Sequence, residues 1–275
     1  MTDSTFYFFF LNRFSAGNLA SKFAASELYS ELLSHLPDLM QIEQKKSLHL
    51  SSNTNAADNG YNWKEDIRAN VTKAFENVHR RFLDRIATIT SVTSEVGSAP
   101  KMDQSGTTAT ALLVTEDVVI AAVLGDSRGV LASVSHKDRT APIPTNSKGK
   151  SQWKNFPEVS AIPFSIDHVA SDSTEQALVI ERGGYVSKSG GTARVNGTLA
   201  ITRSIGDANL AAVLSREPHV RIFDRSELRE LCGDLGKEGN NNMNRTAIPC
   251  FAILGESAFR FDNECLFSFH LPSLY

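Results

Sequence analysis

Apolar residues recur every three or four positions in two stretches near the start of the chain. The first stretch, residues 19–36, ends where Pro37 interrupts the pattern. The second stretch, residues 63–86, is longer, and its opposite side carries lysine, arginine, glutamate and aspartate. An apolar stripe at this spacing is typical of an amphipathic helix. We therefore expect two helices, each with one side against a core and one side in water.

Short, continuous apolar runs elsewhere in the chain predict strands instead. FYFFFL at residues 6–11 predicts a buried strand, and CFAIL at residues 250–254 predicts a late one. Three further runs fill residues 109–134, with possible turns at 115–117 and 126–128. We expect these three runs to be antiparallel strands in hairpin order. The middle run, VVIAAVL, shows no alternation, which predicts burial on both faces of its sheet.

Capping and turn residues indicate how the second half of the chain is organised. Asp172 is suited to cap a helix, Glu175 completes a capping-box-like pattern, and a glycine pair at 183–184 ends it. Asn196-Gly197 predicts a tight turn, and residues 207–214 suit a short helix. Neither a GxGxxG nor a Walker motif is present. The pattern favours an α+β sandwich of stacked antiparallel sheets with helices packed outside.

Composition and charge exclude several classes of function. The 275 residues are 41% hydrophobic and 21% charged with a net charge of −3, so no positive field favours nucleic acid. No apolar run reaches the ~18 residues of a membrane span, and no membrane insertion is expected. The three cysteines form no CxxC pair, which favours a reducing, intracellular compartment over a disulfide framework or a zinc site. The opening segment lacks the basic start of a signal peptide.

Two polar groups at the ends of apolar runs are candidates for chemistry. Asp126 follows a buried run in LGDSRG, where it could cap a turn, pair with Arg128 or Arg203, or bind a hard cation. Arg203, Gly206 and Asp207 end the run LAITRSIGD, and a polar tip of this kind suggests a binding site.

The histidines are weaker candidates than these acids. No two of them have the spacing of metal ligands. We expect His168 to be a loop residue rather than a ligand, and His35, His79 and His136 to lie on helix surfaces or in loops. A G-x-S-x-G elbow is absent as well, which argues against hydrolysis by a catalytic triad.

Six blocks in the middle of the chain resemble the metal-dependent protein phosphatases, the PPM or type 2C family, in the family's own order. They are SGTTATALLV, VLGDSRGVL, FSIDH, ERGGYV, RVNGTLAITRSIGD and REPHV. The resemblance covers roughly residues 60–225, with a weaker match in the helix at 18–36. SGTTAT together with LAITRSIGD is most similar to the branch that includes the mitochondrial branched-chain ketoacid dehydrogenase phosphatase.

The resemblance implies a fold, a reaction and partners. The implied fold is a four-layer α/β/β/α sandwich forming one domain over 1–275, family-like over 18–36 and 60–257. The ends, 1–17 and 258–275, are atypical, as if the domain were truncated. Two Mn²⁺ or Mg²⁺ ions in a cleft would activate a water that attacks phosphoserine or phosphothreonine. The implied partner is a phosphoprotein substrate or another protein, in the cytoplasm or, by the closer resemblance, in mitochondria.

The two main metal-binding blocks of the family are altered in this sequence. Asn12, Arg13, Phe14 and Ser15 stand where the first block has aspartate, glycine and histidine, and Ser257 replaces the aspartate of the second. Glu256 is one position away, where a strand would point it to the other face. Asp126 matches a family aspartate that binds an additional, weaker metal. Arg203, Gly206 and Asp207 match a block near the cleft, and we interpret them as support for the sheet end and the flap.

Three hypotheses follow from this mixture of retained and altered blocks. The protein could be an active phosphatase of the family, or a pseudophosphatase that binds partners through its cleft or flap. It could also be a splice or gene-model variant of an active phosphatase with both ends replaced. Because metal activation of water contributes many orders of magnitude in rate, we expect negligible phosphatase activity from this chain.

Overall fold

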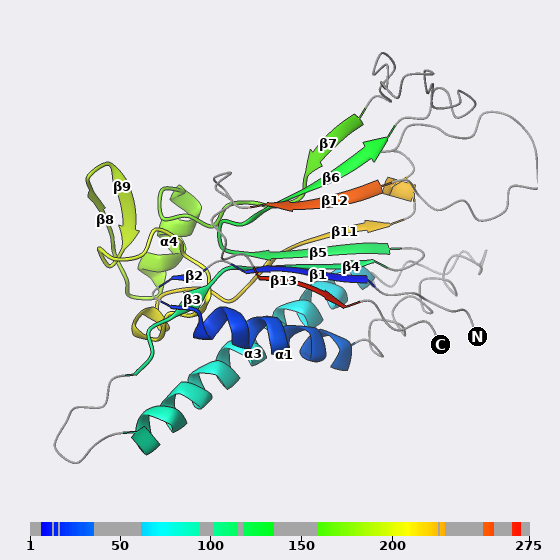
Figure 1. Ribbon diagram of the computed structural model, residues 1–275. Coiled ribbons are helices and arrows are strands. Elements are labelled where there is room, and N and C mark those ends of the chain that lie inside the picture. The colour runs from blue at the N-terminus through cyan, green and yellow to red at the C-terminus, as the bar shows by residue number, and fades with distance from the viewer. Residues whose placement is uncertain are drawn as a thin grey trace, which may run out of the picture.

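The fold is built from two sheets packed face to face, with two long helices against the outer side of one of them (Figure 1). The computed structural model describes residues 7–12, 14–15, 17–35, 62–93, 102–114, 118–134, 159–224, 226–228, 250–255 and 266–270. Within these ranges no helix is long and apolar enough to cross a membrane.

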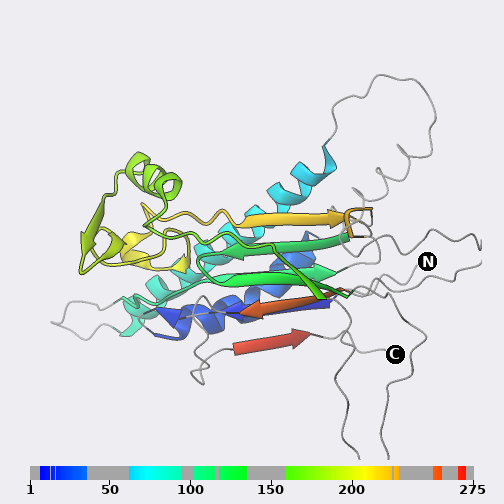
Figure 2. The same cartoon turned by 90° about the horizontal axis from the view of Figure 1, so that it is seen from above.

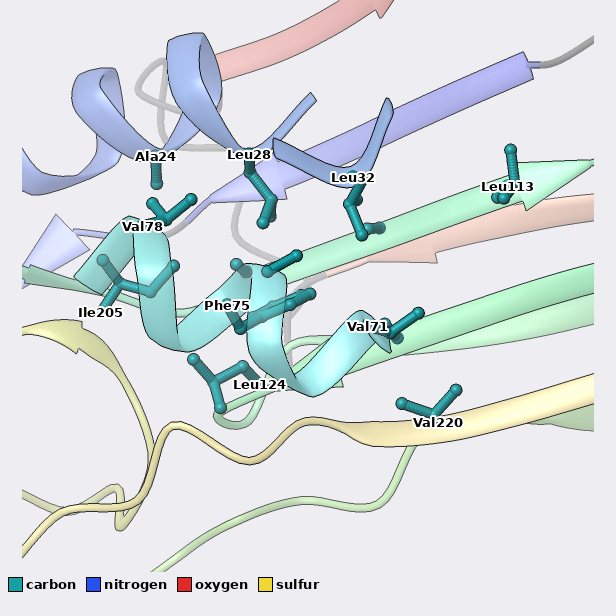
Figure 3. Packing of buried hydrophobic residues seen from close by; sticks show 14 of the residues in the cluster. Ala24, Leu28, Leu32, Val71, Phe75, Val78, Leu113, Leu124, Ile205 and Val220 are labelled. Carbon is teal, nitrogen blue, oxygen red and sulfur yellow. The ribbon is translucent and has the colours of Figure 1, made fainter. Parts of the chain in front are cut away.

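Both apolar stripes form the helices that they predict. Helix α1 spans Leu19–Ser34 and helix α3 spans Trp63–Thr93. Leu28 of α1 and Phe75 of α3 are completely buried between the helices and the sheet (Figure 3). Phe82 of α3 is completely buried in the same cluster. Burial of such side chains is the main source of stability for this layer.

The larger sheet is entirely antiparallel, and its strand order mixes early and late parts of the chain. In order across the sheet, it contains β11 (His219–Asp224), β5 (Val118–Leu124), β4 (Ala109–Val114), β1 (Tyr7–Asn12) and β13 (Leu266–His270). The predicted strand at FYFFFL is therefore confirmed as β1. Every residue of β5 is buried, as its lack of alternation predicts.

The second sheet shows that the predicted hairpin order is only half right. It contains β12 (Cys250–Gly255), β6 (Arg128–Val134) and β7 (Val159–Pro163). Strands β4 and β5 form the expected hairpin, but β6 pairs with β7 and β12 instead of with β5. Both edges of β5 are already occupied by β4 and β11. The turn after β5 therefore carries the chain from one sheet to the other.

Two smaller units stand at one end of the sheets (Figures 1 and 2). One is a short sheet of β10 (Ile205–Gly206), β3 (Gly106–Thr107) and β2 (Phe14–Ser15). The other contains α4 (Ser173–Glu181), β8 (Val186–Ser189) and β9 (Thr192–Val195), and we call it the flap unit.

The predicted turn and short helix near the flap unit have different outcomes. The turn at Asn196-Gly197 is confirmed, since both residues have positive φ, 46° and 74°. The short helix expected over 207–214 is reduced to one 3₁₀ turn, Ala208–Leu210.

The two-sheet core and its helices agree with the α+β sandwich predicted from the sequence. In the described part of the chain, α1 and α3 cover the outer face of the larger sheet (Figure 1). The matching helical layer on the second sheet is not among the described residues. The prediction that residues 1–275 form a single domain stays a prediction.

Helix α4 begins at the predicted cap, which provides a modest test of the local structure. The Asp172 carboxylate accepts hydrogen bonds from the backbone N–H groups of Thr174 and Glu175, at 2.9 and 3.0 Å. Asp172→Ala should therefore lower the free energy of unfolding by about 1 kcal/mol, measured by urea denaturation. Asp172→Asn keeps the acceptor oxygen and should stay close to the wild type; equal losses in both variants would contradict the capping role.

Candidate functional site

The Asp126 turn, Gly125-Asp126-Ser127, connects the two sheets at the end of β5. Gly125 has a φ of +94°, and a Cβ on it would lie 2.3 Å from Cγ2 of Thr108. The buried hydroxyl groups of Thr108 and Ser127 are hydrogen bonded at 2.8 Å. The backbone on either side of Asp126 is therefore fixed against the segment that leads into β4, while Asp126 itself is half-buried.

His168 holds the same turn from the other side. The ring Nδ1 of His168 accepts the backbone N–H of Gly125 at 3.1 Å, and the backbone N–H of His168 donates to the Gly125 carbonyl at 3.0 Å. Burial, followed by the positive charge of Arg203, lowers the pKa of His168 to about 4. The ring is therefore neutral near pH 7, and Nδ1 has a lone pair to accept with. His168 lies in a loop, as predicted, but it is buried there.

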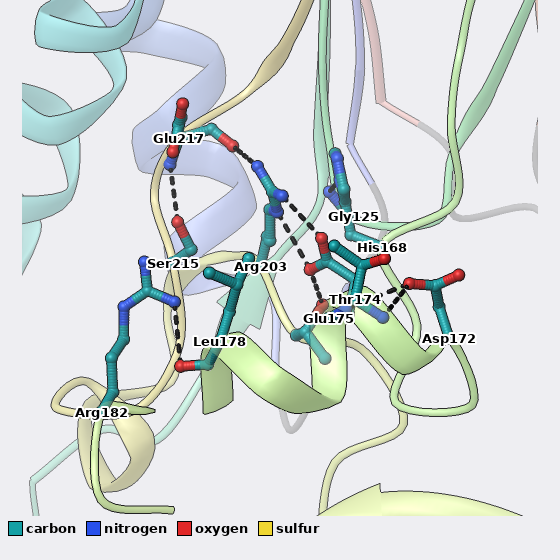
Figure 4. A network of polar contacts seen from close by, with 11 residues as sticks. Gly125, His168, Asp172, Thr174, Glu175, Leu178, Arg182, Arg203, Ser215 and Glu217 are labelled. Atoms are coloured by element: carbon teal, nitrogen blue, oxygen red, sulfur yellow. Dashed lines mark hydrogen bonds and ion pairs between the residues drawn. The ribbon is translucent and has the colours of Figure 1, made fainter. Parts of the chain in front are cut away.

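Arg203 and Glu175 form a buried ion pair beside this histidine (Figure 4). Arg203 Nη2 and Nε lie 2.6 and 3.0 Å from the two carboxylate oxygens of Glu175, a bidentate arrangement. Thr202 also donates its hydroxyl to Glu175. Burial alone would raise the pKa of Glu175, but these hydrogen bonds and the Arg203 charge hold it below its ordinary value.

This pair corrects the predicted capping box. Glu175 turns toward Thr202 and Arg203 rather than back to the start of α4. A reciprocal cap would leave the guanidinium of Arg203, which is only 13% exposed, without its counter-ion, and an unpaired buried charge is strongly destabilising. The i, i+3 spacing from Asp172 therefore identified Glu175 as an interacting residue, but its carboxylate binds Thr202 and Arg203 instead of the backbone at the start of α4.

Arg128 forms an ion pair with Asp167. Its Nε lies 3.0 Å from Oδ1 of Asp167, and Nη2 lies 2.5 Å from Oδ2. Hydrogen bonds and charge from Asp167 raise the pKa of Arg128, and the charge of Asp126 adds a smaller contribution. The structure thus pairs Arg128 with Asp167 and Arg203 with Glu175.

Asp207 is tied into the interior next to the β3–β10 pairing. The Ser204 hydroxyl donates to its carboxylate at 2.6 Å, and its backbone N–H donates to the Ser105 carbonyl at 2.9 Å. The side chain lies directly over Gly106, where a Cβ would be 1.9 Å from the carboxylate oxygen. A left-handed backbone, with φ of 51°, brings the acid into this position.

His79 departs from its predicted place on a helix surface. It is buried in α3, and its Nδ1 accepts the backbone N–H of Gly206 at 3.1 Å. Burial, followed by the positive charge of Arg216, lowers the pKa of His79 to about 4. The long helix is therefore joined directly to the segment that carries Gly206 and Asp207. The apolar stripe did not reveal this, because His79 adjoins Val78 at the margin of the stripe.

The buried His79 predicts a loss of stability in mild acid. The unfolded chain binds its proton near pH 6.5 and the folded chain only near pH 4, so stability is complete above 6.5 and decreases as the pH falls below it. At pH 5 the expected decrease from this histidine is about 2 kcal/mol. Urea unfolding at pH 7 and pH 5 measures it, and His79→Gln should remove this part of the difference. An unchanged pH dependence in that variant would rule out His79 as the source.

With the fold and these contacts in place, comparison with known proteins decides the family. The model of the protein phosphatase 2C family matches residues 25–231, most of the chain. The chain belongs to the protein phosphatase 2C family. Among the relatives, probable protein phosphatase 2C 17 of Arabidopsis thaliana is 29% identical over 158 residues, covering 57% of this chain and 43% of that protein. Protein phosphatase 2C 3 of the same plant is 30% identical over 165 residues, covering 60% and 32%.

Two solved structures share the fold at low sequence identity. A serine-threonine phosphatase 2C from Toxoplasma gondii matches with a TM-score of 0.55 and 16% identity, covering 80% of this chain and 64% of that one. A C. elegans sex determining protein matches with a TM-score of 0.51 and 19% identity, covering 80% and 40%. The chain spans less than half the length of the plant relatives. None of these matches supports the branched-chain ketoacid dehydrogenase phosphatase branch.

The phosphatase 2C family is generally metal-dependent, so the described residues can be tested for a fit to its metals. Asn12 ends β1, while Arg13 and Ser257 lie outside the described residues, as do His136 and Glu256. In the described ranges no three His, Cys, Asp or Glu side chains gather as a metal site. Asp167 and Glu175 pair with arginines, and Asp207 accepts from Ser204. These donors do not fit two hard cations, which need several converging oxygen ligands.

Proposed function

We propose that the protein is a phosphatase 2C-type domain that recognises phosphoserine and phosphothreonine proteins but is catalytically impaired. The observation that carries the proposal is that acidic side chains near the Asp126 turn are paired with arginines. Asp167, which precedes His168 in sequence, and Glu175 of α4 form bidentate pairs with Arg128 and Arg203. Glu175 above all is a poor ligand for a second cation, because metal binding would leave the buried guanidinium of Arg203 without its partner.

The size of the catalytic effect supports the same proposal. Phosphate ester hydrolysis depends on a metal-activated water and on cations that stabilise the developing charge. Asp126 is the position in the described residues that matches a family metal ligand, and a single carboxylate supplies only a small part of a two-metal site. We therefore expect Mn²⁺ or Mg²⁺ to bind weakly at Asp126 and to produce no efficient turnover.

Hydrolysis of a phosphothreonine peptide in millimolar Mn²⁺ tests the proposal. The purified protein should release phosphate no faster than its Asp126→Ala variant, measured over hours at pH 7.5. Asp172→Ala, which changes only a helix cap, provides a matched aspartate control. Metal-dependent turnover in the wild type and in Asp172→Ala that disappears in Asp126→Ala would overturn the proposal.

The flap unit, which the structure retains, favours a binding function. The Glu175–Arg203 pair connects the flap unit to the segment that carries Arg203. β-Bridges at Val169–Ile201 and Arg203–Ser215 hold that segment in place. A retained scaffold without an efficient metal centre suits a module that holds a phosphoprotein or another protein. Fluorescence anisotropy with a labelled phosphothreonine peptide should show binding that persists in EDTA. Binding that requires Mn²⁺ would favour the enzyme over the binding module. An intracellular location is part of the same proposal.

A further inference from the structure

A continuous series of contacts runs from the flap unit to the Asp126 turn (Figure 4). In α4, Glu175 holds Thr202 and Arg203 through its carboxylate. The backbone N–H of Thr202 donates to the carbonyl of His168 at 3.0 Å. His168 in turn holds Gly125 through its ring and its backbone. Each group in the series is buried or half-buried, so water competes little for its hydrogen bonds.

We propose that His168 is the positioning residue of the Asp126 turn, and that the Glu175–Arg203 pair couples its position to the flap unit. The inference rests on the proposed function only in treating Asp126 as a functional residue. The contacts themselves do not depend on a metal or on activity. A partner that shifts α4 would thus change the geometry of the turn that presents Asp126.

The surroundings of the turn explain why the Gly125 N–H needs a hydrogen-bond acceptor from another segment. The Gly125 N–H is buried, and a buried donor without a partner is destabilising. The hydroxyls of Thr108 and Ser127 are hydrogen bonded to each other, and the acceptor that the structure gives to the Gly125 N–H is the His168 ring. Gly125 also has a positive φ and no room for a side chain. The turn therefore depends on an acceptor that arrives from a distant segment, and Nδ1 of His168 is that acceptor.

Amide hydrogen exchange on protein labelled with ¹⁵N-glycine tests the proposal without metal or substrate. The chain supplies its own reference, because the Gly206 N–H also donates to a histidine Nδ1, that of His79, at the same 3.1 Å. Global destabilisation accelerates the exchange of both amides, whereas a local effect changes only their ratio. The measured quantity is the exchange rate of Gly125 divided by that of Gly206.

Two substitutions of the histidine separate positioning from simple packing. His168→Leu removes the acceptor and should raise the ratio about tenfold. Loss of one hydrogen bond increases the equilibrium constant for local opening by up to about tenfold. His168→Asn places an oxygen near the position of Nδ1 and should keep the ratio within about twofold of the wild type. A ratio that does not change in His168→Leu, or that rises equally in His168→Asn, would overturn the positioning role.

A second pair of variants tests the connection to the flap unit. Glu175→Gln should raise the ratio about threefold, because it weakens the hold on the segment that supports His168. Glu31→Gln is the matched control, since Glu31 likewise accepts from an arginine and a neutral side chain, Arg81 and Asn77. It should leave the ratio unchanged. Equal ratios in Glu175→Gln and in the wild type would contradict the coupling. Because no step uses phosphatase activity, this failure is distinguishable from failure of the proposed function.

Discussion

Gly206→Ala is expected to destabilise the protein by about 4 kcal/mol or more, enough to prevent folding of a marginal domain. Gly206 has a φ of +91°, a conformation that side chains rarely adopt. A Cβ on it would lie 2.3 Å from the backbone carbonyl oxygen of Ser105. That oxygen also accepts the N–H of Asp207, so it cannot move without loss of another hydrogen bond.

Gly191→Ala separates the clash at Gly206 from the effect of backbone conformation. Gly191 has a nearly equal φ of +86° in the turn between β8 and β9, and nothing lies within 4 Å of its added Cβ. This substitution should lower the free energy of unfolding by only about 1 kcal/mol. Urea unfolding, with soluble expression yield as a second measure, compares the two variants. Similar losses would show that φ alone determines the cost and that the contact with Ser105 does not.

The elements that the sequence predicts well are those with a strong local signal. The stripes of α1 and α3 follow from burial of one helix side, and the uninterrupted apolar run of β5 follows from burial on both faces of its sheet. The Asp172 cap and the Asn196-Gly197 turn are equally local, because each depends on the backbone within three residues. Local periodicity and capping were sufficient for these elements.

The predictions that were wrong depend on partners that are far away in the sequence. Strand β6 does not pair with β5, because β11, about ninety residues later, occupies the free edge of β5. Glu175 does not complete its capping box, because Arg203 and Thr202 compete for its carboxylate. No local pattern contains these competitors.

Most residues of the candidate site could be predicted from the sequence, but their hydrogen-bond and ion-pair partners could not. The family blocks brought Asp126, Arg203 and Asp207 to attention, yet His168 was interpreted only as a loop residue. The signal that could have found it is the buried N–H of Gly125, which needs an acceptor once β5 ends in a turn. The roles assigned to Asn12, Arg13 and Ser257 in losing the metal ligands stay predictions.

Glu175→Ala is expected to lower the free energy of unfolding by about 3 kcal/mol. The Arg203 side chain is 13% exposed and that of Glu175 is 7% exposed, so removal of the acid leaves a buried guanidinium without its counter-ion. Thr202 loses its acceptor at the same time. The Arg128–Asp167 pair provides the matched comparison, because it has similar geometry while Arg128 is 57% exposed. Asp167→Ala should cost about 0.5 kcal/mol, since water replaces the lost contact.

A double variant determines whether the loss in Glu175→Ala comes from the unpaired charge or from the cavity. Glu175→Met combined with Arg203→Met removes both charges and keeps most of the volume. It should recover more than half of the stability that Glu175→Ala loses, because apolar replacement of a buried pair is often nearly neutral. Urea unfolding of all the variants at pH 7.5 measures the difference. If the double variant is as unstable as Glu175→Ala, the hydrogen bonds to Thr202 and to the Glu217 carbonyl, rather than the unpaired charge, hold the flap unit to the core.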